Sequence, residues 1–151
     1  MILNSKILGA DEKKIIILHG FLGSLDNWVT FAKKLSNNGY EVHLIDQRNH
    51  GKSFHSDDFN YELMANDLYK YLYEKNINKT SILGHSMGGK TAMLYSLIYP
   101  DTINKLIVVD ILPVNYNTNY DEIFEALLEI DLKEIKSRND FNIHLNKHFD
   151  D

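Results

Sequence analysis

The feature that most constrains the fold is a series of short, nearly continuous apolar runs. They are four or five residues long and rich in β-branched residues, and they read IIIL at 15–18, VHLI at 42–45, SILG at 81–84 and KLIVV at 105–109. Such runs are typical of strands buried on both faces. Because parallel strands need long crossover connections, this spacing predicts an α/β fold with a mostly parallel sheet and helices on both faces.

The segments between these runs have a helical period. Apolar side chains three and four residues apart share one face in 28–35 and in 64–72, and a third such segment starts just after Ser86 and stops before Pro100. We expect three crossover helices, the last of them ended by the proline ring. The first apolar run, 2–8, alternates more strongly and predicts an edge strand in a hairpin.

Composition places the chain among ordinary globular proteins. It has 151 residues, 44% of them hydrophobic and 25% charged, which is enough to build one compact core. It has no cysteine, so neither a disulfide framework nor a thiolate metal site is available. The first residues do not resemble a signal peptide, and no run approaches 18 apolar residues. We therefore expect a cytoplasmic protein without a membrane partner.

Charge argues against a nucleic-acid partner. Residues 1–116 carry 12 acidic and 12 basic side chains, whereas residues 117–151 carry 9 and 4, so the whole net charge of -5 lies in the last 35 residues. Phosphate binding draws its affinity from clustered Lys and Arg, and the chain shows no such cluster.

The strongest chemical signal is the G-x-S-x-G pattern of Gly84, His85, Ser86, Met87 and Gly88. It stands between a predicted strand and a predicted helix, where such a pattern forms a sharp turn that exposes a nucleophilic serine. The two glycines leave room for the crowded backbone of this turn. The Met87 N–H would lie at a helix N-terminus, where it can stabilise a developing oxyanion.

A second oxyanion donor is expected in LHGFLGS, residues 18–24, which follows the first buried strand. Its glycines would let the backbone fold back toward the serine and present the N–H of Phe21 or, less readily, of Leu22. The alternative is that this His-Gly segment is a plain turn.

Three segments in order, HGFLGSLDNW, DQRNHGKS and GHSMGGK, resemble the α/β-hydrolase family, and VVDILPVNY narrows the resemblance to the YbfF-type esterases and the ABHD11-like proteins. The resemblance implies hydrolysis of a small-molecule ester or thioester through an acyl-enzyme, with a helical cap and no metal or organic cofactor. It implies that 1–114 is the N-terminal part of the hydrolase core and that 115–151 is a partial cap. The sheet would stop after about the sixth strand, and its exposed edge would favour self-association.

The family resemblance also places Asp110 as the carboxylate that orients a catalytic histidine, although a plain turn-forming role remains open. The family histidine follows the last strand, and none of the seven histidines occupies that place. We expect activity to be impaired in this chain for that reason. The alternative from another class is a non-catalytic fragment or a pseudo-hydrolase that only binds ligands.

Two further readings concern neighbouring motifs. We expect Asp46 and Arg48 to have a structural role, in which they hold the turn after their strand by charge-assisted hydrogen bonds. The alternative is that they contact the substrate. GHSMGGKT, residues 84–91, also satisfies the spacing of a phosphate-binding loop, but this reading leaves the two upstream motifs unexplained.

Overall fold

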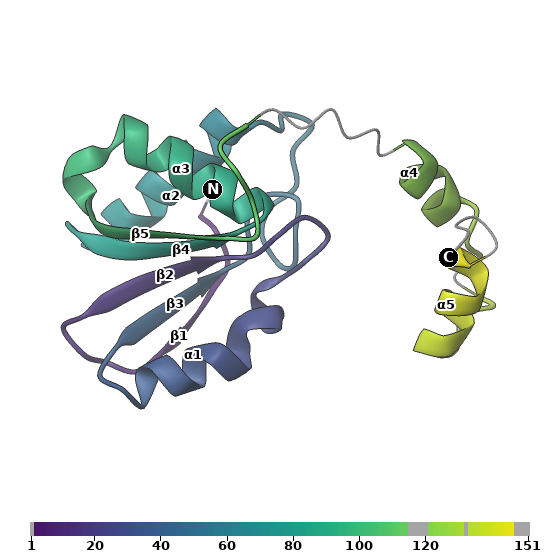
Figure 1. The fold of residues 1–151 in the computed structure, drawn as a ribbon, viewed down its shortest axis with the longest axis horizontal. Helices are drawn as coiled ribbons and strands as arrows, with labels where there is room; N and C mark the ends of the chain where they lie inside the picture. The colour runs from purple at the N-terminus through teal and green to yellow at the C-terminus, as the bar shows by residue number, and fades with distance from the viewer. Residues whose placement is uncertain (1, 115–120, 132, 147–151) are drawn as a thin grey trace. The chain divides into compact units, whose positions relative to one another are not determined.

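A five-stranded sheet forms the centre of the N-terminal part of the protein (Figure 1). The computed structural model describes residues 2–114, 121–131 and 133–146. The strand order within these residues is β1-β3-β2-β4-β5, and every neighbouring pair is parallel except β1 and β3. The strands are β1 (Ser5–Leu8), β2 (Lys14–Leu18), β3 (Glu41–Ile45), β4 (Thr80–His85) and β5 (Ile103–Val109).

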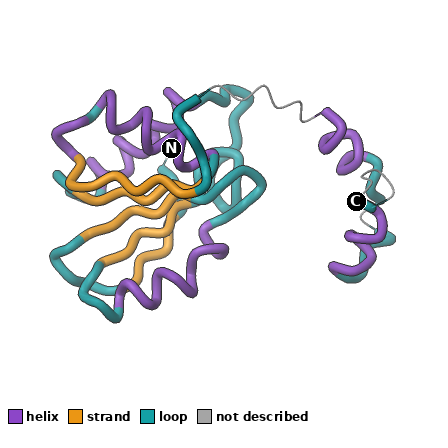
Figure 2. The backbone as a smooth tube through the Cα atoms, viewed as in Figure 1, coloured by secondary structure: helices purple, strands orange, loops and turns teal. Residues whose placement is uncertain are grey.

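Helices cover both faces of the sheet, as the sequence predicts. Figure 1 shows α1 on one face and α2 with α3 on the other, and Figure 2 shows the same layers with the strands in orange between helices in purple. The helical segments are η1 (Leu25–Trp28), α1 (Val29–Ser36), α2 (Tyr61–Glu74), α3 (Met87–Ile98) and η2 (Pro100–Thr102). The proline opens η2 directly after α3, so its ring ends the helix where expected.

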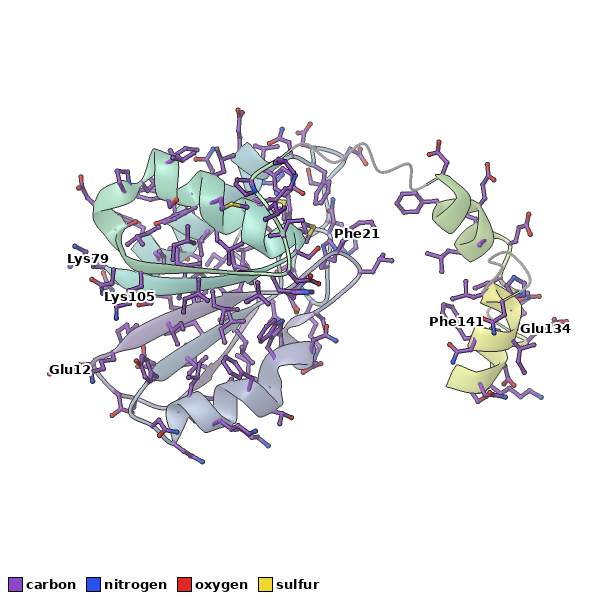
Figure 3. The ribbon with its side chains drawn as sticks, in the orientation of Figure 1. Glu12, Phe21, Lys79, Lys105, Glu134 and Phe141 are labelled. Atoms are coloured by element: carbon purple, nitrogen blue, oxygen red, sulfur yellow. The ribbon has the colours of Figure 1, made fainter. Side chains whose placement is uncertain are left out.

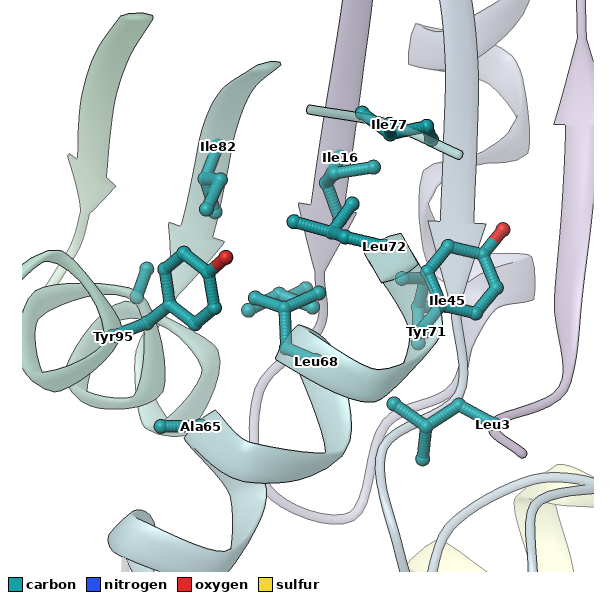
Figure 4. Packing of buried hydrophobic residues seen from close by; sticks show 12 residues of the cluster. Leu3, Ile16, Ile45, Ala65, Leu68, Tyr71, Leu72, Ile77, Ile82 and Tyr95 are labelled. Carbon is teal, nitrogen blue, oxygen red and sulfur yellow. The ribbon is translucent and has the colours of Figure 1, made fainter. Parts of the chain in front are cut away.

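The two faces of the sheet have separate hydrophobic cores. Ile16 and Leu18 of β2 pack against α2 and α3, whereas Ile15 and Ile17 lie on the opposite face of the sheet and pack in the cluster that includes α1. Figure 4 shows the first of these clusters, with Leu68 of α2 among the strand side chains. Successive residues of a strand point to opposite faces, so a run that is apolar throughout fills both cores.

The edge strand β1 differs from the expected hairpin. It lies at the edge of the sheet, as predicted, but pairs antiparallel with β3 rather than with the next strand β2. Both sides of β2 are occupied by β3 and β4, so β1 cannot pair with β2 and pairs with the outer side of β3. Gly9, at φ 81°, turns the chain away after β1 where its backbone passes Tyr40.

Residues Val114–Asp151 form a second compact unit. It contains α4 (Asp121–Leu128) and α5 (Arg138–Leu145), and Ala126 and Ile130 are buried apolar residues among those described in it. The Ser137 hydroxyl caps α5 by accepting a hydrogen bond from the backbone of Asp140. The expected polar loop 115–120 lies outside the described residues, and the assignment of this unit to a cap stays a prediction.

Asp46 ties together the loops at the carboxyl end of the sheet. Its carboxylate accepts hydrogen bonds from the N–H groups of Leu25 and Lys52, at 2.8 and 2.9 Å, and from the Asn4 side chain at 2.8 Å. Burial alone would raise the pKa of the Asp46 carboxyl, but these hydrogen bonds to its charged form lower that pKa overall. The structural role predicted for Asp46 therefore agrees with the geometry.

Arg48 has a structural environment too. Its Nε donates to Asp67 of α2 at 2.6 Å, its Nη1 donates to the Asp58 carbonyl at 2.6 Å, and its guanidinium lies over the Phe54 ring. Both members of the ion pair are buried, so removing one would leave the other uncompensated.

Replacing Asp46 by Asn should destabilise the fold in a pH-dependent way. The folded pKa is lower than the unfolded one, so this carboxylate contributes stability above the unfolded pKa and loses it as pH falls through the folded pKa. We expect D46N to lower the free energy of unfolding by about 2 kcal/mol at pH 7, because the amide NH₂ would face the N–H groups that the carboxylate accepts from. The loss should become smaller in strongly acidic medium. Urea unfolding across pH measures this, with D101N on exposed η2 as the control; an equal loss at every pH would contradict the assignment.

The outer strand β5 should promote self-association. Leu106, Ile107 and Val108 are each more than a third exposed, and within the described residues β5 has no strand on its outer side. An unpaired apolar edge invites pairing with another chain, and a charge on it opposes pairing. We expect the elution volume of the protein to shift with concentration in size-exclusion chromatography and Ile107→Lys to reduce that shift. Leu97→Lys, on the exposed side of α3, is the matched control and should leave the shift unchanged.

Candidate active site

Ser86 occupies a strained turn between β4 and α3. Its backbone has φ 50° and ψ -117°, a conformation that L residues rarely adopt, and it stands between the last residue of β4 and the first residue of α3. Strain of this size persists only where the surrounding structure imposes it, and it is found at functional sites. The strand, turn and helix expected around the G-x-S-x-G pattern are all present.

The glycines of the pattern are required by close backbone contacts. A Cβ on Gly84 would lie 2.2 Å from the Gly88 carbonyl oxygen, and a Cβ on Gly88 would lie 2.5 Å from the Leu18 carbonyl oxygen. Helix α3 therefore starts pressed against the ends of β4 and β2. Met87 is its first residue, so the Met87 N–H belongs to the helix N-terminus beside Ser86.

The loop after β2 is fixed by a buried histidine. His19 Nδ1 donates to the Gly20 carbonyl at 2.8 Å, and its Nε2 accepts from the Gln47 N–H at 3.1 Å. The Gln47 side chain returns a hydrogen bond to the His19 carbonyl at 2.8 Å. Burial lowers the pKa of His19, so the ring is neutral at pH 7 with both nitrogens engaged. His19 is thus a structural part of the loop and has no nitrogen free for proton transfer.

Gly20 brings this loop against the serine. A Cβ on Gly20 would lie 3.2 Å from the Ser86 Cβ and 2.8 Å from His85 Nδ1. Phe21 follows, and Figure 3 labels it at one end of the sheet, opposite the end where Lys79 precedes β4. The Gly23 N–H closes a turn onto the Gly20 carbonyl at 3.1 Å. The segment is therefore a turn and also lies beside Ser86.

Asp110 follows β5 next to the serine. The Ser86 N–H donates to the Val109 carbonyl at 3.0 Å, which joins the two turns. Asp110 has φ 55°, and its side chain is 86% exposed. Its Oδ2 lies 3.7 Å from His85 Nε2, beyond hydrogen-bond distance. The carboxylate therefore faces solvent beside the serine and is accessible to a further group.

His43 and His50 are held by hydrogen bonds to groups other than Ser86. His43 is buried within β3, with its Nε2 bonded to Glu41 and its Nδ1 to the Tyr71 hydroxyl. His50 donates from Nδ1 to the Arg48 carbonyl. Within residues 2–114, 121–131 and 133–146, no hydrogen bond joins the Ser86 hydroxyl to a histidine. His144 lies in the second unit, and His148 falls outside the described residues.

An open cavity of about 620 Å³ lies beside the candidate site. Its wall is formed by the loop after β2, by η1 and α1, and by His85. The helical period correctly placed Ala32 in the core, but Phe31 of the same stripe is 40% exposed and lines the cavity together with Trp28. Helical spacing predicts the face of the helix on which a side chain lies. Whether that face is buried or borders a cavity depends on a loop elsewhere in the chain.

Residues 84–91 do not form a phosphate-binding loop. Gly84 and His85 still belong to β4, and α3 begins at Met87, so no loop remains to enclose a phosphate. In the part of the chain that the structure describes, no group of three or more His, Asp or Glu side chains is arranged to hold a metal ion. No described helix is long and apolar enough to cross a membrane.

Comparison with known proteins agrees with this geometry. A family model described as alpha/beta hydrolase fold matches residues 13–136. Esterase YbfF of Escherichia coli is 38% identical over 129 residues, covering 85% of this chain and 50% of that protein. The sn-1-specific diacylglycerol lipase ABHD11 of Danio rerio is 41% identical over 123 residues, covering 80% and 39%.

A solved structure, a marine microorganism esterase, has a TM-score of 0.90 at 42% identity and covers 99% of this chain and 59% of that chain. The chain thus spans about half or less of the length of the two curated relatives. The family match covers most of its residues, and the strands, helices and serine turn occur in the expected order. The chain therefore belongs to the alpha/beta hydrolase fold family.

Proposed function

We propose that this chain carries the nucleophile of a serine esterase that cleaves small carboxylic esters or thioesters through an acyl-enzyme. The observation that carries the proposal is the strained backbone of Ser86, at φ 50°, at the junction of β4 and α3. This turn exposes a serine hydroxyl at the carboxyl end of a parallel sheet, where ligands bind in open α/β folds. The names of these relatives, esterase and lipase, support ester chemistry.

In the first step, the Ser86 oxygen attacks the ester carbonyl while a base removes its proton. Negative charge develops on the former carbonyl oxygen, and the N–H groups of Met87 and Phe21 donate to it. The position of Met87 at the start of α3 supports its role, because helix N-termini stabilise negative charge. The position of Gly20 against the Ser86 Cβ supports the role of the next residue, Phe21.

In the second step, the leaving group departs with a proton from the base, and water hydrolyses the acyl-Ser86 ester. Asp110 would orient a histidine from outside these 151 residues. Its exposure and its place directly after Val109, whose carbonyl accepts from Ser86, support that role. His85 Nε2 lies 3.7 Å from Asp110 Oδ2, within ion-pair distance but beyond hydrogen-bond distance. We expect the protein to act in the cytoplasm, in line with the absence of cysteine.

Added imidazole should restore part of the missing base function. We expect the chain to hydrolyse p-nitrophenyl butyrate slowly, because loss of a catalytic histidine costs about 10⁶-fold in kcat in a serine protease. Imidazole should then raise the rate in a saturable, Ser86-dependent manner, as a small molecule takes the place of the absent side chain. The release of p-nitrophenol with and without imidazole measures this.

Ser86→Ala is the matched control, because imidazole also cleaves activated esters in free solution. The variant should show only that background. If it responded to imidazole as the unchanged chain does, Ser86 would not be the nucleophile. An unchanged chain that never exceeds the background, although folded, would favour the alternative of a non-catalytic binding module.

A further inference from the structure

We propose that the cavity beside Ser86 binds the far end of the substrate and selects an apolar chain that ends in an anion such as a carboxylate, sulfate or phosphate. The inference deepens the proposed function and rests on it, because it takes the reacting carbonyl to lie at Ser86. It names a substrate class that ester chemistry alone does not specify.

The cavity adjoins the candidate site, although Ser86 itself does not line it. Gly20 and His85 line it, and both adjoin Ser86, one through a close approach to the Ser86 Cβ and the other through the chain. Its volume of about 620 Å³ lies within the range of small-molecule sites, roughly 300–1,000 Å³. A substrate whose carbonyl lies at Ser86 can therefore extend into the cavity past Gly20.

The wall nearest the serine is aromatic. The Trp28 ring lies 6.0 Å from the His85 ring and 5.7 Å from the Phe31 ring, measured between ring centroids. Phe31 is 40% exposed, so its ring offers apolar surface toward the cavity. Such a surface favours an alkyl or aryl chain over a polar one.

The opposite end of the wall carries a positive charge. Lys34 lines the cavity and comes three residues after Phe31, so the two side chains share one face of α1. Lys34 comes six positions after Trp28, about 9 Å along a helix axis. No carboxylate lines the cavity, and no described acidic side chain forms an ion pair with Lys34. The cavity thus grades from aromatic near Ser86 to cationic at its far end.

A purely structural role for Lys34 has a control within the same helix. Lys33 and Lys34 both lie in the last turn of α1, where a positive charge stabilises the helix C-terminus. Lys33 does not line the cavity. Replacing either lysine by Met changes the helix and the net charge equally, so only a cavity ligand distinguishes the two variants.

Trp28 provides a direct readout, because it is the single tryptophan of the chain and lines the cavity. The experiment is a fluorescence titration of the full chain carrying Ser86→Ala, which removes turnover. The probes are monomethyl adipate, which carries one negative charge, and dimethyl adipate, which is neutral. We expect monomethyl adipate to bind about fivefold more tightly than dimethyl adipate, which is the upper end of the effect of an ion pair open to solvent. K34M should remove that preference. K33M should keep that preference, and added salt should weaken the binding of monomethyl adipate but not of dimethyl adipate.

Several results would overturn the inference. Equal affinity for the two probes, or an equal loss in K33M and K34M, would show that Lys34 does not select an anion. An unchanged Trp28 emission with both probes would show that the cavity does not bind them. None of these outcomes bears on hydrolysis, which is measured separately with Ser86 present, so failure of the cavity and failure of the nucleophile are distinguishable.

Discussion

The close approach of backbone at Gly84 and Gly88 is the constraint on which the candidate site depends. A side chain at either position would overlap a carbonyl oxygen, of Gly88 in one case and of Leu18 in the other. Because both lack a Cβ, α3 begins directly after β4, and the turn has room for a single residue. Ser86 is that residue, and its φ of 50° follows from the lack of space for a relaxed turn. The strain and the helix N-terminus beside it have the same origin.

Buried hydrogen bonds hold the neighbouring loops beside the serine turn. The carboxyl ends of parallel strands meet at one edge of a sheet, so the loops after β2 and β3 lie next to the serine turn. His19 and Gln47 join these two loops through hydrogen bonds at 3.1 and 2.8 Å, and Asp46 fixes the start of η1 through Leu25. Each of these side chains is nearly inaccessible to water, where a polar group is costly unless paired. They act on the site by holding backbone in place.

The sequence allowed most of the fold to be predicted, because continuous apolar runs identify buried parallel strands and glycine spacing identifies a crowded turn. It did not predict the pairing of β1, since an alternating run shows which face is buried but not which strand is adjacent. The cavity was also missed, because Phe31 and Ala32 fit one helical stripe although only Ala32 is in the core. The packing of His50 beside His19, 5.1 Å between ring centroids, also depends on contacts distant in sequence that no local pattern indicates.

Binding and chemistry are separable in this chain. A general base needs one nitrogen free for the nucleophile and another held by a carboxylate. His19 and His43 each use both nitrogens in buried hydrogen bonds, and burial lowers the pKa of both rings, so they serve the fold in their neutral form. Asp110 is exposed beside Ser86, and its Oδ2 lies 3.7 Å from His85 Nε2. The cavity, by contrast, is lined by described residues before position 86, so binding of a ligand there can be tested independently of hydrolysis.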